Sequence, residues 1–302
     1  MRVGSTQHRD LFCRWFIETH VAWEPADLPW PPLDVALVER LRAFPFWSHA
    51  RSIERRAGKL VSGFAETIED PLMREAVALQ GMEETRHGRL MGHVLEHYRI
   101  DVPEVPFAEP RGTMEDFRIF GFGECMDSFL GFGAFAIARR KRLFPAALLD
   151  IFDTFMWEEA RHIAFFTNWW RYEQARAGRD GVLRRTLESV AYYLKTASAP
   201  ARGAADVPWP KLEGNELFDS IAADITPATF LAAALEANRS MMARVDRRLL
   251  RPVLMPRLAT ALLLGIRMLP PREPAVTPAA SSFARAGICF ADTICGRQRR
   301  SN

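Results

Sequence analysis

Two short strings, EETRH at residues 83–87 and EEARH at residues 158–162, decide how this chain folds. Each string places a glutamate and a histidine three positions apart. On an α-helix that separation is about 60° around the axis and about 4.5 Å along it, so the two side chains point the same way. A carboxylate and an imidazole that converge from one helix face can bind one transition-metal ion. One Glu-x-x-His is common by chance, but two near-identical copies on different predicted helices indicate a metal centre.

Four long helices are predicted around these strings. Apolar residues recur at three- and four-residue intervals, and no stretch alternates as a strand would. Asp70-Pro71 and Phe144-Pro145 mark tight turns, the first because aspartate caps a helix and proline is tolerated at its first position. Two antiparallel hairpins of this kind assemble a four-helix bundle. The expected helices cover residues 46–69, 71–99, 113–143 and 144–177.

The chain continues well beyond this bundle. Three accessory helices are expected at residues 181–196, 226–250 and 256–269, a Pro/Gly/Ala-rich loop at 198–214, and a partly disordered tail from 270. The expected fold class is therefore all-α. We expect a single domain over residues 1–302, with a bundle core at about 46–176 and accessory helices at about 181–269.

A two-metal bundle also needs one glutamate from each of the other two helices. Glu124 lies 35 positions before Glu159 and sits between phenylalanine and glycine residues, where an unpaired carboxylate is costly. Glu54 lies 30 positions before Glu84, at the matching depth of the first hairpin. Glu66 is the alternative on that helix, but it is only a few residues from the turn. The expected ligands are Glu54, Glu84, His87, Glu124, Glu159 and His162, a set of carboxylates and imidazoles that suits iron or manganese better than a thiolate zinc site.

At these residues the sequence resembles the ferritin-like di-iron carboxylate superfamily. The string at 83–88 is most similar to the first metal motif of soluble acyl-carrier-protein desaturases, and the string at 158–162 is similar to their second. The resemblance covers about residues 46–176. It implies a ferritin-like four-helix bundle with two iron ions, or manganese at one or both positions. It also implies dioxygen as a reactant, a small-molecule or carrier-bound substrate, and an electron donor such as a ferredoxin or flavoprotein.

The function expected from this resemblance is that of an oxidase or oxygenase of the hydroxylation, desaturation or N-oxygenation type. The long segment after the bundle favours an organic substrate, because additional helices can cover a pocket. Two alternatives stay open: a ferroxidase or iron-handling protein without an organic substrate, and a helical binding protein without a redox metal.

Each string begins with two adjacent glutamates, and these doubled acids lead to a more detailed prediction. Consecutive helix residues are about 100° apart, so Glu83 and Glu158 cannot face the metals as squarely as the next residue of each string. A metal-bound histidine needs an acceptor for its other N–H. We therefore predict a crossed outer layer, in which Glu83 accepts from His162 and Glu158 accepts from His87. Arg86 and Arg161 are expected to neutralise the buried charge. The alternative is one exposed pair within each string, Glu83 with Arg86 in the first and Glu158 with Arg161 in the second.

The charge and the cysteines limit which partners, metal sites and cellular locations can be expected. The net charge of +3 is too small to indicate nucleic acid binding, although residues 235–302 carry +8 and could form either a solvated face or a docking patch. The four cysteines show no zinc spacing, and no signal-peptide layout is present at the N-terminus. We expect a cytoplasmic protein with reduced thiols. The apolar stretch at 258–269 is too short for a transmembrane segment, and a homodimer stays open.

Overall fold

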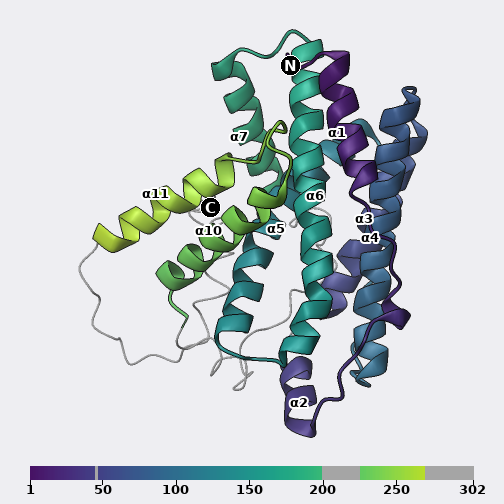
Figure 1. Cartoon of the computed structure of the whole chain (residues 1–302), viewed down its shortest axis with the longest axis vertical. Coiled ribbons are helices and arrows are strands. Elements are labelled where there is room, and N and C mark those ends of the chain that lie inside the picture. Colours follow the sequence, from purple (N-terminus) through teal and green to yellow (C-terminus); the bar gives the residue numbers. More distant parts are fainter. Residues whose placement is uncertain (45–46, 199–224, 269–302) are drawn as a thin grey trace, which may run out of the picture.

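The computed structural model describes residues 1–44, 47–198 and 225–268, and these residues are helical with no β-strand. The predicted all-α fold class is therefore confirmed (Figure 1). Within these ranges the elements are α1 (Thr6–Glu18), η1 (Pro25–Asp27), α2 (Val35–Ala43), α3 (Trp47–Glu66), α4 (Pro71–His97), α5 (Met114–Arg140), α6 (Ala146–Arg176), α7 (Val182–Ser198), α10 (Pro227–Arg244) and α11 (Leu254–Met268). The predicted loop at 198–214 and the predicted tail from 270 fall almost entirely outside the described residues.

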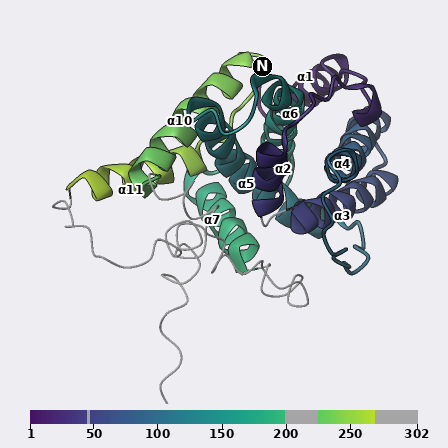
Figure 2. The ribbon, with the colours of Figure 1, turned by 90° about the horizontal axis from the view of Figure 1, so that it is seen from below.

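The four longest helices, α3 to α6, form the two predicted hairpins (Figures 1 and 2). The Asp70 carboxylate caps α4 by accepting from the Met73 N–H at 2.9 Å, and Pro71 takes the first helical position. Thr113 and Asp116 form a reciprocal capping box at the start of α5. These caps fix where each helix begins, so they also fix the depth of every residue in the bundle.

Small residues let α3 and α4 approach closely. A Cβ at Gly81 would lie 2.8 Å from the Ser62 backbone nitrogen, which no larger residue could tolerate. A Cβ at Gly88 would lie 3.3 Å from the Arg55 nitrogen. Since Gly88 follows His87 and Arg55 follows Glu54, this close contact brings Glu54 to the level of His87.

Aromatic side chains fill the centre of the bundle. The rings of Phe64, Phe117 and Trp169 from α3, α5 and α6 lie within 4.6–5.8 Å of one another, measured between centroids. The glycines of α5 serve the same packing, because a Cβ at Gly121 would overlap Phe166 and a Cβ at Gly133 would lie 2.7 Å from the Ala234 Cβ. Close helix contact therefore accounts for these two glycines.

The first 44 residues form an element that the sequence patterns did not predict. Helix α1 packs against both α4 and α6, the two helices that carry the repeated strings (Figures 1 and 2). Phe12, Cys13 and Phe16 are fully buried there, and His8 hydrogen-bonds Asn168 at 3.0 Å. The chain then runs through η1 and α2 before it enters α3. The N-terminal segment is therefore part of the core.

The accessory helices α7, α10 and α11 pack on α5. The predicted helix at 226–250 is six residues too long, because α10 ends at Arg244 and Val245 is extended. Beyond this end, the Asn168 side chain accepts from the Leu250 N–H at 3.0 Å and donates to the Leu250 carbonyl at 2.9 Å, so these backbone groups are paired outside a helix. Among the described residues, no helix is both long enough and apolar enough to cross a membrane.

Candidate metal centre

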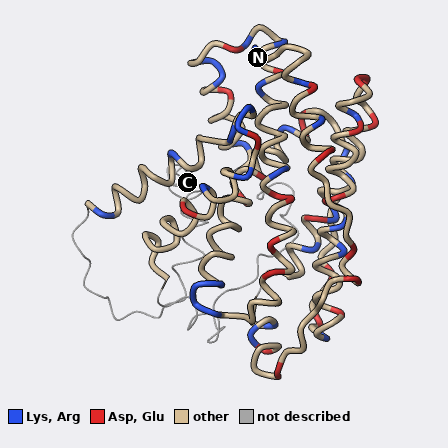
Figure 3. The backbone as a smooth tube through the Cα atoms, viewed as in Figure 1, with Lys and Arg blue, Asp and Glu red and all other residues tan. Residues whose placement is uncertain are grey.

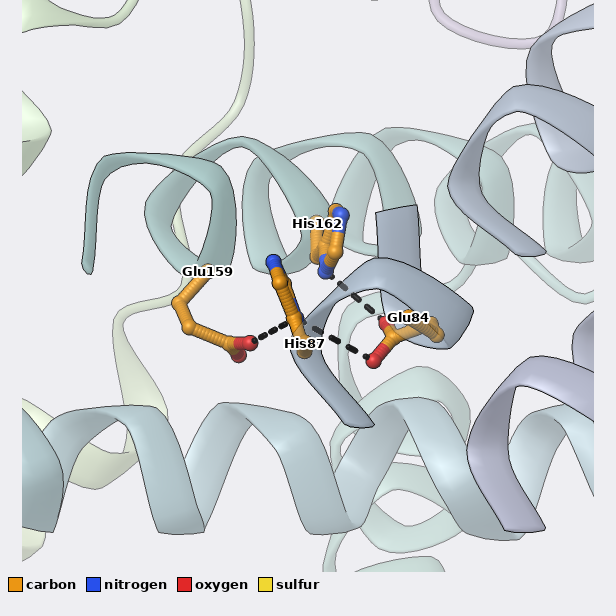
Figure 4. A group of neighbouring side chains, drawn as sticks. All are labelled: Glu84, His87, Glu159 and His162. Carbon is orange, nitrogen blue, oxygen red and sulfur yellow. Dashed lines mark ion pairs between the residues drawn. The ribbon is translucent and has the colours of Figure 1, made fainter. Parts of the chain in front are cut away.

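The two strings bring four buried side chains together between α4 and α6 (Figure 4). His162 Nδ1 lies 2.9 Å from a Glu84 oxygen, and His87 Nδ1 lies 3.1 Å from a Glu159 oxygen. His87 Nδ1 is also 3.6 Å from the other Glu84 oxygen. One ligand atom of each residue lies within 4.8 Å of those of the others, a spacing that could hold a metal ion.

The two further glutamates lie beside this group. Glu54 of α3 places Oε2 3.7 Å from His87 Nδ1, whereas the alternative, Glu66, is exposed at the end of the same helix. Glu124 of α5 is close enough to Glu159 and Glu84 for their charges to act strongly on it. The six residues predicted as ligands therefore converge, and we call Glu54, Glu84, His87, Glu124, Glu159 and His162 the inner layer.

The inner layer contains buried polar atoms without a hydrogen-bond partner. These atoms are Nδ1 of His87, Nδ1 of His162, Oε2 of Glu84 and Oε2 of Glu124. Buried polar atoms are nearly always satisfied, and an exception calls for an explanation such as an ion. Two imidazole nitrogens and two carboxylate oxygens are suitable donors for iron or manganese. The residues therefore fit a metal pair.

The pKa values of the inner layer show how crowded its charges are. Burial raises the pKa of Glu54 to about 8, and burial together with the charges of Glu159 and Glu84 raises that of Glu124 well above its ordinary value. Burial alone would lower the pKa of His162, but the charge of Glu84 and the hydrogen bond to Glu83 raise it to about 10. Without a metal, protons on the imidazoles neutralise the carboxylates. Metal ions would displace those protons, as is usual when histidine binds a metal.

The crossed contacts predicted from the doubled acids are present. The Glu83 carboxylate accepts from His162 Nε2 at 2.8 Å, and the Glu158 carboxylate accepts from His87 Nε2 at 2.9 Å. We call Glu83, Glu158, Arg86 and Arg161 the outer layer. The alternative of exposed pairs within each string is wrong, because all four residues are buried.

The arginines cross over as well. Arg86 donates to Glu158 at 2.5 Å and Arg161 donates to Glu83 at 2.7 Å, so each arginine pairs with the acid of the other string. Burial would raise the pKa of Glu83, but hydrogen bonds and charges from His162 and Arg161 outweigh burial and lower it to about 2. The outer layer is therefore a balanced set of two carboxylates and two guanidinium groups.

Four residues of the N-terminal segment complete this outer layer and were not predicted. His20 Nδ1 donates to Glu83 at 2.6 Å and Trp23 Nε1 donates to Glu158 at 2.8 Å. Arg161 donates to the Thr19 hydroxyl at 3.0 Å and to the Phe16 carbonyl. The available signal was the apolar periodicity of residues 6–18, which indicates a helix but not where it docks.

His20, Glu83 and Glu158 also have the composition of a metal-binding group. The two carboxylates already accept from both guanidinium groups, the Trp23 indole and the inner-layer histidines. A cation there would face two fixed positive charges. We therefore assign no metal to this group.

Phe155 and Ser128 contact the inner layer directly. The edge of the Phe155 ring packs against His87 at 4.6 Å between centroids, and Ser128 donates to Glu159 Oε2 at 3.0 Å. An open groove of about 730 Å³ lies instead over α4 and η1, with Glu24, Arg51, Arg89 and His93 among its lining residues. No inner-layer residue lines this groove.

No family model, curated protein or solved structure matches this chain.

Proposed function

We propose that this protein is a ferritin-like di-iron oxidoreductase that uses dioxygen to oxidise an organic substrate, either a small molecule or one bound to a carrier. The supporting observation is the contrast within each histidine. Nε2 hydrogen-bonds an outer-layer glutamate, whereas Nδ1 is buried among carboxylates without a hydrogen bond. A histidine that binds a metal through one nitrogen and donates from the other has this arrangement.

The six inner-layer side chains would hold two iron ions, with manganese as the alternative metal. Glu54 and Glu159 contact His87 Nδ1 at 3.7 and 3.1 Å, whereas Glu84 contacts Nδ1 of both histidines, at 2.9 and 3.6 Å. When bound, the ferrous pair would supply the reduction of dioxygen, with two electrons from an external donor and two from the substrate.

The chain's own residues hold this site in place and keep it dry. The outer layer fixes the ring orientation of both histidines, and the Phe155 ring makes one wall apolar. Water exclusion strengthens each electrostatic contact within the site. In the metal-free protein Glu54 and Glu124, whose pKa values are raised, are the inner-layer carboxyl groups most suited to hold a proton near neutral pH.

A ferroxidase or iron-handling protein is the second candidate. The observation that favours it is the position of the 730 Å³ groove, which no inner-layer residue lines. An enzyme that oxidises only iron would need no organic pocket at its metals.

The electron donor remains part of the proposal, with residues 139–142 or the basic C-terminal segment as its docking face. Figure 3 shows the basic residues at the turn after α5. Arg139 already pairs with Asp150 and Asp153, and Arg140 pairs with Glu236. Charge-dependent docking there would have to compete with these internal pairs, and the basic C-terminal segment is described only as far as residue 268.

One experiment separates the candidates. The protein is purified without oxygen, loaded with ferrous iron, and exposed to dioxygen with a reductant and a set of organic and carrier-bound compounds. Mass spectrometry that finds an oxidised organic product supports the oxygenase. Rapid iron oxidation without any product in repeated trials supports the ferroxidase, and a chain that binds no iron rejects both.

A further inference from the structure

Residues 16–23 follow the seam between α4 and α6 and touch the outer layer at both ends. His20 contacts Glu83 and Trp23 contacts Glu158, at 2.6 and 2.8 Å. In both glutamates Oε2 accepts from an inner-layer histidine, while Oε1 accepts from an arginine and from the N-terminal residue. The N-terminal segment therefore supplies one hydrogen-bond donor to each of the two outer-layer glutamates.

The same segment also covers the two arginines. The Phe16 ring lies over the Arg161 guanidinium at 4.4 Å, and the Trp23 ring lies over the Arg86 guanidinium at 4.6 Å. Arg161 is fully buried and Arg86 is 3% exposed. Since an aromatic face attracts a cation most strongly when both are shielded from water, these rings help to hold each guanidinium against its glutamate.

Two unbroken lines of contact follow from this arrangement. One runs from His20 through Glu83 to His162, and the other runs from Trp23 through Glu158 to His87. Each line ends at an Nδ1 atom that has no hydrogen-bond partner. A displacement of His20 or Trp23 would therefore be passed to the orientation of one imidazole.

We propose that His20 and Trp23 are positioning residues of the metal centre, and that metal binding and docking of the N-terminal segment stabilise each other. This inference rests on the metal site of the proposed function, but not on its reaction. Coupling of this kind is reciprocal: if docking raises metal affinity by some factor, metal raises the docking equilibrium by the same factor.

The test uses two substitutions that keep the shape of the segment. Trp23→Phe keeps an aromatic ring at this position but removes the indole N–H together with part of the ring, and His20→Phe removes the donor to Glu83. Trp30→Phe is the matched control, because the Trp30 indole lies in the same part of the chain but donates to the Pro25 carbonyl instead. Thermal melts of the metal-free proteins confirm that all three variants fold.

Ferrous iron affinity is measured without oxygen by competition with a coloured chelator. We expect each of the two variants to bind iron about 10-fold more weakly than wild type, the lower end of what such supporting contacts contribute, and the control to match wild type. The ligand-field spectrum of bound cobalt(II) should shift in the two variants, which a loss of general stability would not cause.

Hydrogen exchange on the full-length protein tests the reciprocal effect. Iron should slow exchange in residues 14–24 of wild type and should slow it less in Trp23→Phe. Unchanged affinity in both variants, with the N-terminal exchange unaffected by iron, would overturn the inference and leave the proposed function standing. A wild-type protein that binds no iron would overturn both.

Discussion

The inner and outer layers of the buried centre both contain glutamates, but their polar atoms are satisfied in opposite ways. In the outer layer, Glu83 and Glu158 each accept from a histidine, an arginine and an N-terminal residue. In the inner layer, four buried nitrogen and oxygen atoms have no hydrogen bond. In each imidazole Nε2 is hydrogen-bonded and Nδ1 is not. The fold therefore fixes the direction in which Nδ1 points. The difference between the layers is therefore our main reason for inferring a metal.

Removal of the inner-layer histidines should have the largest effect. We expect wild type to bind about two irons per chain, His87→Ala or His162→Ala to lose at least one, and the double variant to lose nearly all. Metal analysis of protein loaded without oxygen gives the numbers. His93→Ala is the control, because His93 stacks on Trp30 outside the centre. Full occupancy in the double variant would show that the metals bind elsewhere.

The pH dependence of the metal-free protein should also separate the layers. The pKa of His162 is raised to about 10, so its protonated form stabilises the fold below about pH 6.5 and this contribution is lost as the pH rises through 10. The pKa of Glu54 is raised to about 8, so burying its charge costs stability as the pH rises from about 4.5 to 8. Both effects lower the stability of the fold as the pH rises. The metal-free protein should lose roughly 2–5 kcal/mol between pH 6.5 and 10.

Thermal melts with and without metal measure this effect. Metal should reverse much of the loss, because it replaces the displaced protons and binds more tightly as the pH rises. Glu54→Gln should remove the part of the slope below pH 8. A metal-free melting temperature that stays level or increases from pH 6.5 to 10 would contradict these protonation states. The outer layer contributes little to this window, since the pKa of Glu83 is lowered to about 2.

Glu83→Gln and Glu158→Gln test the outer layer directly. Each variant keeps the shape but leaves a buried arginine without its carboxylate, and loss of such a supporting contact typically lowers metal affinity or activity about 10–100-fold. Glu104→Gln is the control, because Glu104 pairs with Arg55 at an exposed position. Iron titration of the three variants gives the comparison. Wild-type iron retention in both outer-layer variants would show that the crossed contacts do not support a metal.

Helix geometry explains why this much of the centre could be predicted. The crossed contacts follow from about 100° of rotation between neighbouring residues, and the depth of Glu54 follows from its distance to the Asp70-Pro71 turn. The rotation is a local relation within a helix and the depth is one within a hairpin, and the crossing adds only the pairing of α4 with α6. The sequence therefore predicted the two hairpins, the convergence of six residues and the crossing.

The N-terminal contribution could not be predicted in the same way. The Arg161–Thr19 contact joins residues 142 positions apart, and nothing in the spacing of residues 16–23 indicates which surface they cover. The position of Leu250, beyond the end of α10, depends on a similar long-range contact, because the Asn168 side chain holds it across 82 positions. Long-range polar contacts of this kind have no period in the sequence.

The smallest effect is expected from Ser128→Ala, and it sharpens the comparison of the layers. Ser128 donates to Glu159 Oε2 at 3.0 Å, one of the few hydrogen bonds to the inner layer. In the metal-free protein its loss should cost about 1 kcal/mol, as for an ordinary buried hydrogen bond. With metal bound, Glu159 has a cation as its partner, so iron affinity should change less than about threefold, well below the loss expected in the outer layer. Ser189→Ala is the control, since Ser189 accepts from Trp170 away from the centre. Chemical denaturation of the metal-free protein and iron titration measure the two effects. A Ser128→Ala loss of affinity as large as that of Glu83→Gln would mean that both layers depend equally on their hydrogen bonds, and the distinction between them would fail.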